Sequence, residues 1–450
     1  MQSLLPNRIN LTLFLLTLFC SLMIDVGPIW QGYSDPYDYM YQSTVSLFNI
    51  EFYNPAKSAQ YYPRPFTVPL FYKMANGNPT LIIVMQKFIH ALSTFFFASV
   101  IILYLKNNFS KIIFIFSWYI FMTWWNISGW DNTILSESLS LSLMFMWFGT
   151  FLLYVKIKKT STFIFHICIT ILFSFTRDSW PYILLIFYLS YFILSFKLEK
   201  GMSRKYLTLF TFSLILFFVQ QHTAKTGERY RLPVLNNIVY RILPNADYTN
   251  WFKKEGLPCL NELQKEYSNS ANYKAIYPLY LNDSTYKDLH HWASEKGNTV
   301  YMKFLLTHPS QLFLLDETKE NLDRIFAYDL TYATGEQGLS RFSSYIFPLF
   351  NPFALLILIG FYCYLCFKNN STNWMFPAIT TLICVENAFL LYNADALEVE
   401  RHLFFTNVLM QFIGMLVTIY IFDSPFVVNL IRTLYQHILS ILKKMLAIQN

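Results

Sequence analysis

The chain has 450 residues, of which 54% are apolar, 19% are aromatic and only 14% are charged. Soluble domains carry about 25% charged residues, and no soluble core of this size could enclose 45 Phe, 32 Tyr and 10 Trp side chains. The composition therefore excludes a disordered chain, a collagen, a coiled coil and an ordinary cytosolic enzyme, and it indicates an all-α polytopic membrane protein.

The net charge of +7 arises from 34 basic and 27 acidic residues, and the basic residues form short clusters rather than one stripe. We therefore expect no nucleic-acid partner. Six cysteines are too few for a disulfide framework. No glycine-rich phosphate-binding fingerprint occurs in the sequence, which argues against chemistry driven by ATP or by cytosolic nucleotide sugars.

A helix that crosses a bilayer needs about 20 mostly apolar residues, and somewhat fewer where neighbouring helices bury its ends. Apolar runs of this kind predict about ten transmembrane helices, at 10–30, 80–105, 111–126, 134–155, 161–176, 180–196, 205–221, 345–367, 374–392 and 403–422.

These spans divide the chain into four predicted regions. An N-terminal transmembrane module at 1–221 contains seven spans and a first outer loop at 31–79, in which we expect juxtamembrane helices. The polar stretch at 222–344 predicts a small extracytoplasmic domain. A C-terminal module of three spans occupies 345–424. In the residues at 425–450, apolar side chains alternate with basic ones, which is typical of an amphipathic helix on the membrane surface.

Lys and Arg in short loops predict the orientation, because cytoplasmic loops are enriched in them. Alternate connections are basic, from Arg8 to the C-terminal tail, whereas the opposite set is poor in Lys and richer in Asp and Glu. We therefore expect both termini in the cytoplasm, in a multi-pass protein of the plasma membrane, of the bacterial inner-membrane type.

Ionisable side chains at membrane depth are costly and usually functional. In this sequence they gather near helix ends on the predicted outer side, and they come from five separate connections. A transporter would place such groups near the bilayer midplane instead. The candidate site residues are Asp35, Asp38, Arg64, Glu137, Arg177, Glu400, Arg401 and His402.

Several of these residues, and Asp178 beside Arg177, could also have an ordinary structural role. Asp35 precedes a proline and could cap a helix. Glu137 lies near a helix start, where its charge suits the helix dipole. Arg177 and Arg401 could extend to lipid headgroups, and Asp178 could pair with an arginine or cap the sixth span. Their common placement on one face favours the functional interpretation.

Three segments, in this order and on one side of the membrane, resemble a known family. They are Ser34-Asp35-Pro36-Tyr37-Asp38-Tyr39, Tyr62-Pro63-Arg64-Pro65-Phe66-Thr67-Val68-Pro69-Leu70 and Ile134-Leu135-Ser136-Glu137-Ser138-Leu139. The chain resembles membrane glycosyltransferases of the GT-C superfamily, particularly the bacterial branch related to lipid A aminoarabinose and protein mannosyl transferases. The resemblance covers about the first third of the chain, with weaker support from Arg177 and from Glu400-Arg401-His402. Many relatives have an acidic pair where this chain has Asp35 followed by Pro36.

The resemblance implies transfer of a sugar from a polyprenyl-phosphate donor to a lipid, glycan or protein acceptor outside the cytoplasm, with inversion. It implies that Asp35 is the catalytic base, because an attacking hydroxyl must lose its proton. Arginines stabilise a leaving phosphate, and this role is implied for Arg64, Arg177 and Arg401. Further implied roles are acceptor or metal positioning by Glu137 and Asp38, additional site contacts by Glu400 and His402, and a divalent cation as a candidate cofactor.

Two other functions stay open from the sequence. An O-antigen polymerase or ligase also has about ten or more spans and a large outer loop with arginines and often a histidine. A lipid or solute transporter without chemistry would depend on polar residues at mid-span, and spans such as 205–219 and 403–418 contain no ionisable group at the midplane.

Overall fold

The structure is a computed structural model that describes residues 5–24, 27–29, 35–54, 63–198, 203–269, 284–315, 323, 325, 342–369, 371–396, 399–429, 433 and 436. Within these ranges the regular structure is helical, apart from one isolated parallel β-bridge between Ile29 and Thr133. The prediction of an all-α fold is confirmed.

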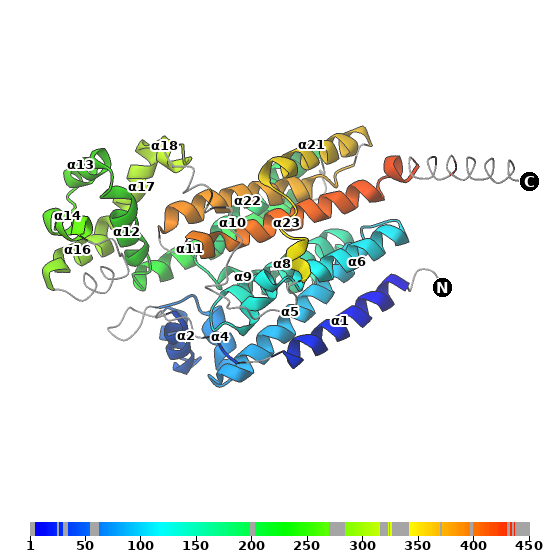
Figure 1. Cartoon of the computed structure of the whole chain (residues 1–450), viewed down its shortest axis with the longest axis horizontal. Coiled ribbons are helices and arrows are strands. Elements are labelled where there is room, and N and C mark those ends of the chain that lie inside the picture. The colour runs from blue at the N-terminus through cyan, green and yellow to red at the C-terminus, as the bar shows by residue number, and fades with distance from the viewer. Residues whose placement is uncertain are drawn as a thin grey trace, which may run out of the picture.

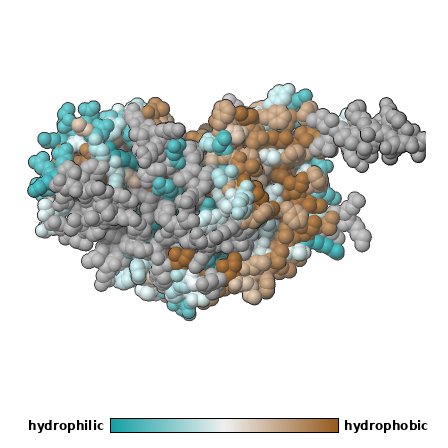
Figure 2. Space-filling model, in the orientation of Figure 1, coloured by the Kyte–Doolittle hydropathy of each residue, from teal (hydrophilic) through white to brown (hydrophobic). Residues whose placement is uncertain are grey.

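Six helices are long and apolar enough to cross a membrane: α1 (Leu5–Met23), α5 (Pro79–Ile102), α8 (Glu137–Ile157), α11 (Ser203–Thr226), α22 (Met375–Ala394) and α23 (Val399–Asp423). Four shorter apolar helices occupy the remaining predicted spans: α6 (Asn108–Met122), α9 (Thr160–Ser174), α10 (Trp180–Leu198) and α21 (Pro352–Lys368). On the side of the molecule seen in Figure 2, apolar residues cover much of the surface of this bundle. The chain is therefore a multi-pass membrane protein.

The two largest errors in the predicted span boundaries are of about seven residues each. The first helix ends at Met23 rather than near residue 30, ahead of Gly27 and Pro28, which disfavour a continuing helix. The eighth begins at Pro352 rather than near residue 345, because Asn351 caps it by accepting from the backbone N–H of Ala354 at 2.7 Å.

The centre of the bundle lies between α8 and α23, since 83% of the apolar window of each helix is buried. The Phe412 ring of α23 packs against Phe145 of α8 and Phe97 of α5, with ring centroids 5.3 and 5.4 Å apart. At one end of the bundle, the Asp423 carboxylate accepts from the backbone N–H groups of Lys106 and Asn107. This contact joins the end of α23 to the turn between α5 and α6.

The other end of the bundle, which we call the α2 end, carries short helices. Figure 1 shows α2 and α4 at this end, whereas α1 begins and α23 ends at the opposite one. The short helices here are α2 (Asp35–Thr44), α3 (Ile50–Tyr53), α4 (Thr67–Met74), α7 (Trp125–Ser128) and η1 (Gly129–Asn132), and η5 (Phe342–Tyr345) precedes α21.

A helical lobe lies beyond the α2 end (Figure 1) and has its own core, which includes the buried rings of Phe252, Tyr286 and Phe304. Asn237 donates to the carbonyls of Asn393 and Ala394, so the lobe is joined to the end of α22. The elements of the lobe are α12 (Arg231–Asn237), η2 (Ile238–Ile242), α13 (Ala246–Lys254), α14 (Leu260–Asn269), η3 (Ser284–Tyr286), α16 (Lys287–Trp292), η4 (Ala293–Gly297), α17 (Asn298–Thr307) and α18 (Pro309–Leu312). The predicted amphipathic tail at 425–450 lies mostly outside the described residues.

The packing of α23 against the segment before α21 generates a stability prediction. A Cβ added to Gly414 would fall on the ring of Phe350, whereas a Cβ added to Gly360 of α21 would meet no atom within 4 Å. We expect Gly414→Ala to lower the melting temperature in detergent, at a cost of about 1–3 kcal/mol for overpacking.

Gly360→Ala is the matched control, since alanine is the better helix former and nothing obstructs its side chain. It should leave the melting temperature unchanged or raise it. Equal melting temperatures for the two variants would contradict the described packing of Phe350.

Candidate active site

Two acids occupy the first turn of α2 at the α2 end of the bundle. Asp35 and Asp38 are three residues apart, and residues with this spacing share one face of a helix. Their negative charges also suit the N-terminus of the helix. The side chain of Asp38 is nearly buried, at 4% exposed, whereas that of Asp35 is 23% exposed.

Arg64 bridges these two acids. Its Nη2 donates to Asp35 Oδ1 at 2.5 Å and to Asp38 Oδ2 at 2.7 Å, and its guanidinium lies over the ring of Tyr39 at 5.5 Å. Gln42 fixes the backbone of Arg64 by accepting from its N–H at 2.8 Å and donating to its carbonyl at 2.9 Å. The segment before α4 is thereby paired with α2.

Arg401, in the first turns of α23, joins the α2 acids to α8. Its Nη2 donates to Asp35 Oδ2 at 3.2 Å, and its Nε donates to Glu137 Oε1 at 2.8 Å. Glu137 is the first residue of α8 and is fully buried. A buried carboxylate needs such a partner, because its charge is costly when it is removed from water.

Arg177 approaches Glu137 from the turn between α9 and α10. Its Nη1 lies 3.4 Å from Glu137 Oε1, and its Nη2 donates to His402 Nδ1 at 3.1 Å. Because a guanidinium has donors only, His402 accepts at Nδ1 and carries its proton at Nε2. That nitrogen lies 3.9 Å from Asp395 Oδ2, and the Arg177 guanidinium lies 5.2 Å from the centre of the Phe405 ring.

Acids and arginines therefore alternate in one buried chain, which we call the ion-pair network. In order, it consists of Asp38, Arg64, Asp35, Arg401, Glu137, Arg177 and His402, and Asp395 lies beyond His402.

The two arginines that contact Asp35 control its ionisation. Burial by itself would raise the pKa of the Asp35 carboxyl, but the charges of Arg64 and Arg401 outweigh it and hold the pKa well below its usual range. Burial likewise would lower the pKa of Arg64, but Asp35, Tyr39 and Asp38 raise it overall. Asp35 is therefore an ionised carboxylate at neutral pH.

The structure brings seven of the eight predicted site residues into this network. The eighth, Glu400, lies half-buried beside Arg401 in the first turn of α23. The catalytic and binding roles expected of all eight stay predictions, because the geometry shows proximity and charge rather than chemistry.

Two further acids near helix ends, Asp131 and Asp178, lie in contacts outside the network. Asp131 Oδ2 is 2.9 Å from His90 Nδ1, and its Oδ1 accepts from Ser138 Oγ at 2.6 Å. Asp178 accepts from Arg229 Nε at 3.1 Å, which is one of the two ordinary roles expected for it.

Several residues of this region were not predicted as site residues. Gln42 and Asp395 contact the network but lie in loops and short helices whose pairing the sequence does not reveal. His90 lies within the apolar run of α5, and Glu386 lies in the middle of α22. Both could have been found from the sequence, because ionisable groups in a span are unusual. One carboxylate oxygen of Glu386 is buried without a hydrogen-bond partner among the described residues.

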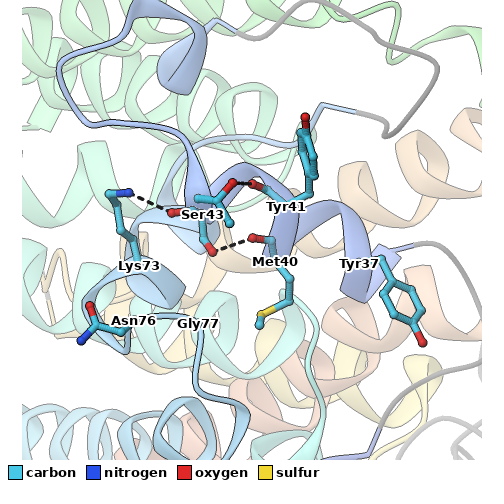
Figure 3. A pocket seen from close by; sticks show the side chains of 8 residues that line it. Tyr37, Met40, Tyr41, Ser43, Lys73, Asn76 and Gly77 are labelled. Atoms are coloured by element: carbon cyan, nitrogen blue, oxygen red, sulfur yellow. Dashed lines mark hydrogen bonds between the residues drawn. The ribbon is translucent and has the colours of Figure 1, made fainter.

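An open cavity of about 700 Å³ lies on the other face of α2 and is separate from the network. Figure 3 shows Tyr37, Met40, Tyr41, Ser43, Lys73, Asn76 and Gly77 around it. Since residues 35, 38 and 42 lie on one side of α2 and residues 37, 41 and 44 on the other, this helix separates the cavity from the acids.

The described residues contain no group of three or more His, Cys, Asp or Glu side chains that could hold a metal ion. Asp35, Asp38 and Glu137 each contact an arginine. In the described arrangement this donor set fits an ion-pair network rather than a cation site, so no step is assigned to a metal.

Removal of Arg401 should destabilise the protein, because it leaves Glu137 buried with the 3.4 Å contact to Arg177 as its remaining ion pair. Breaking a buried ion pair in this way costs about 3–5 kcal/mol. We expect Arg401→Leu to lower the melting temperature in detergent strongly. The double variant Arg401→Leu, Glu137→Leu should recover much of the loss, because both charges are then absent. A double variant less stable than the single one would contradict the pairing.

The low pKa of Asp35 predicts a pH dependence of stability. Because the pKa is lower in the folded than in the unfolded protein, ionised Asp35 stabilises the fold above the unfolded value of about 3.9. This contribution is lost as the pH falls toward the folded value. Thermal unfolding should therefore show a constant difference between the wild type and Asp35→Asn from about pH 8 to pH 5, which shrinks below about pH 4. A difference that changes between pH 8 and 5 would contradict the lowered pKa.

Comparisons with known proteins do not assign this chain to a family. Comparison with protein-family models and with curated protein sequences finds no match to this chain. The functional interpretation therefore rests on the ion-pair network and on the resemblance of the three sequence segments.

Proposed function

We propose that the protein is a membrane glycosyltransferase that moves a sugar from a polyprenyl-phosphate donor to an acceptor on the extracytoplasmic face. The observation that carries the proposal is the convergence of Asp35, Glu137 and the three arginines from separate segments of the chain. Buried charges on this scale are costly in a membrane protein and usually serve a function.

The arginines supply the phosphate site in this proposal. Arg64, Arg177 and Arg401 lie within one network, and guanidinium groups bind phosphate oxygens through charge-assisted, often bidentate bonds. A phosphate accumulates negative charge as the glycosidic bond breaks, and positioned arginines stabilise that charge. In the described state, carboxylates occupy the donors of these arginines, so donor binding exchanges carboxylate contacts for phosphate contacts.

This exchange prepares Asp35 for proton transfer. While Arg64 and Arg401 both donate to it, Asp35 is a weak base. When the donor phosphate takes over those hydrogen bonds, the pKa of Asp35 rises and the carboxylate can accept the proton of the attacking hydroxyl. A single displacement at the anomeric carbon inverts its configuration.

Glu137 holds the site together while Asp35 reacts. It is fully buried and accepts from Arg401, with Arg177 on the same oxygen atom. Substrate phosphate therefore meets arginines whose orientation is already fixed. Asp38 has the corresponding role for Arg64.

The topology of the proposal has ten crossings, with both termini in the cytoplasm and the α2 end outside. It is supported by the ten apolar helices and by the start of α1 and the end of α23 at the same end of the bundle (Figure 1). The helical lobe then lies outside the cytoplasm, next to the network, where it can contact the acceptor.

The test uses purified protein in nanodiscs with synthetic polyprenyl-monophosphate and polyprenyl-diphosphate sugars and a mixture of lipid and glycan acceptors. Transfer is expected with the monophosphate form. Asp35→Asn should reduce the rate by roughly 10²–10⁴-fold, the usual contribution of a general base.

Asp178→Asn is the control, since Asp178 pairs with Arg229 and lies outside the network. It should retain activity. Full activity of Asp35→Asn would remove the proposed base, and turnover with the diphosphate form alone would favour a polymerase or ligase. Binding of the lipid sugar without turnover would favour a transporter.

A further inference from the structure

Three exposed apolar side chains at the α2 end lie in the turn between α2 and α3. Phe48 is fully exposed, Ile50 is 73% exposed and Leu47 is 36% exposed. The backbone N–H of Asn49 donates to Ser46 O at 3.0 Å, so Leu47 and Phe48 are the central residues of a tight turn. Turns in water favour Gly, Asn, Asp, Ser and Pro at these positions. An apolar pair there indicates that the turn does not face water.

The base of this turn is held by hydrogen bonds and by a buried ring. Phe52 is fully buried, and its carbonyl accepts from Gln42 Nε2 at 3.1 Å. Asn49 caps α3 by accepting from the backbone N–H of Glu51 at 3.0 Å. The turn is therefore an ordered projection that presents Leu47, Phe48 and Ile50 outward.

A lysine ties the turn to the start of a membrane-spanning helix. Lys73 Nζ donates to Ser43 O at 3.0 Å and to Val45 O at 2.8 Å, and Figure 3 shows its side chain directed at Ser43. Lys73 lies in the last turn of α4, and a short turn leads from there to Pro79, the first residue of α5. The projection is therefore joined, through Lys73 and α4, to the segment that leads into α5.

The surroundings of the turn continue this apolar surface. Met74, after Lys73, is 68% exposed, and Leu81, in the first turn of α5, is 43% exposed. Exposed tyrosines lie on the adjoining helices: Tyr37 and Tyr41 on α2 and Tyr53 on α3. Aromatic residues with a polar tip are enriched at the membrane–water interface. Two of these tyrosines, Tyr37 and Tyr41, line the cavity of Figure 3 together with Lys73, whose positive charge suits anionic lipid headgroups.

We propose that the turn Ser46–Ile50 is a membrane anchor that inserts Leu47, Phe48 and Ile50 into the lipid leaflet at the α2 end. Its partner is the phospholipid surface, which already surrounds the exposed faces of the bundle.

The anchor fixes the position of the ion-pair network relative to the membrane. Gln42 bonds the base of the turn at Phe52 O and also both backbone groups of Arg64. The same helix carries Asp35 and Asp38. Insertion of the turn therefore sets the height of α2 and Arg64 above the leaflet. This inference does not depend on the proposed function.

The experiment measures lipid contact directly. A photoreactive p-benzoylphenylalanine is introduced at Phe48, and in a second variant at Leu47, in the full-length protein. Each variant is reconstituted in nanodiscs that contain a fluorescent phospholipid and is then irradiated. The matched control carries the same group at Lys254, an exposed position of α13 in the helical lobe. We expect several-fold more lipid adduct at residues 48 and 47 than at residue 254.

Because both replaced side chains project outward, the variants should keep the wild-type melting temperature, which is measured alongside. Adduct yields at residues 48 and 47 no greater than at residue 254 would overturn the proposal. Cross-links from residue 48 to a second copy of the chain, in place of lipid adducts, would also overturn it and would assign the turn to an interface between copies.

Discussion

The ion pairs of Arg401 are the contacts on which the arrangement of the α2 end depends. This residue of α23 binds Asp35 and Glu137, which precede it by 366 and 264 residues. A helix near the C-terminus is thereby joined to the first short helix and to the start of α8. Because Glu137 is fully buried, its charge must have a partner, and the three elements must meet at one point.

The same contacts set the chemical properties of the site. Alternating charges compensate one another, so the acids stay ionised and the arginines keep a fixed orientation. Asp35 is a weak base while two arginines donate to it, and an anion that competes for those donors would make it a stronger one. The helical lobe reaches this region through Asn236, which donates to Asp395 Oδ1 at 2.8 Å, while the other oxygen of Asp395 lies near His402. Movements of the lobe can therefore change the environment of His402.

Much of the fold follows from local patterns, and the errors have local causes. The apolar runs locate the long helices, but they do not reveal that α1 stops before Gly27-Pro28 or that Asn351 caps α21. The site was predictable as a set of residue types at helix ends. The pairing of the acids was not predictable. Asp178, which was placed on the same face as Asp35, pairs with Arg229, and Asp131 pairs with His90. Gln42, in the short helix α2, and Asp395, in a loop, could not be found from the sequence, because polar residues outside the spans usually contact water.

Local sequence patterns are enough to indicate a multi-pass helical membrane protein whose few charges lie near the ends of its spans. Helix formation and membrane insertion depend on hydropathy within about 20 consecutive residues, which can be read directly. Which acid meets which arginine is visible only in the folded chain, because it depends on the packing of helices far apart in the sequence. It also decided that α2 presents Asp35 and Asp38 to the network and Tyr37 and Tyr41 to the opposite side. The rotation of a short helix is set by its neighbours, and its own ten residues do not specify it.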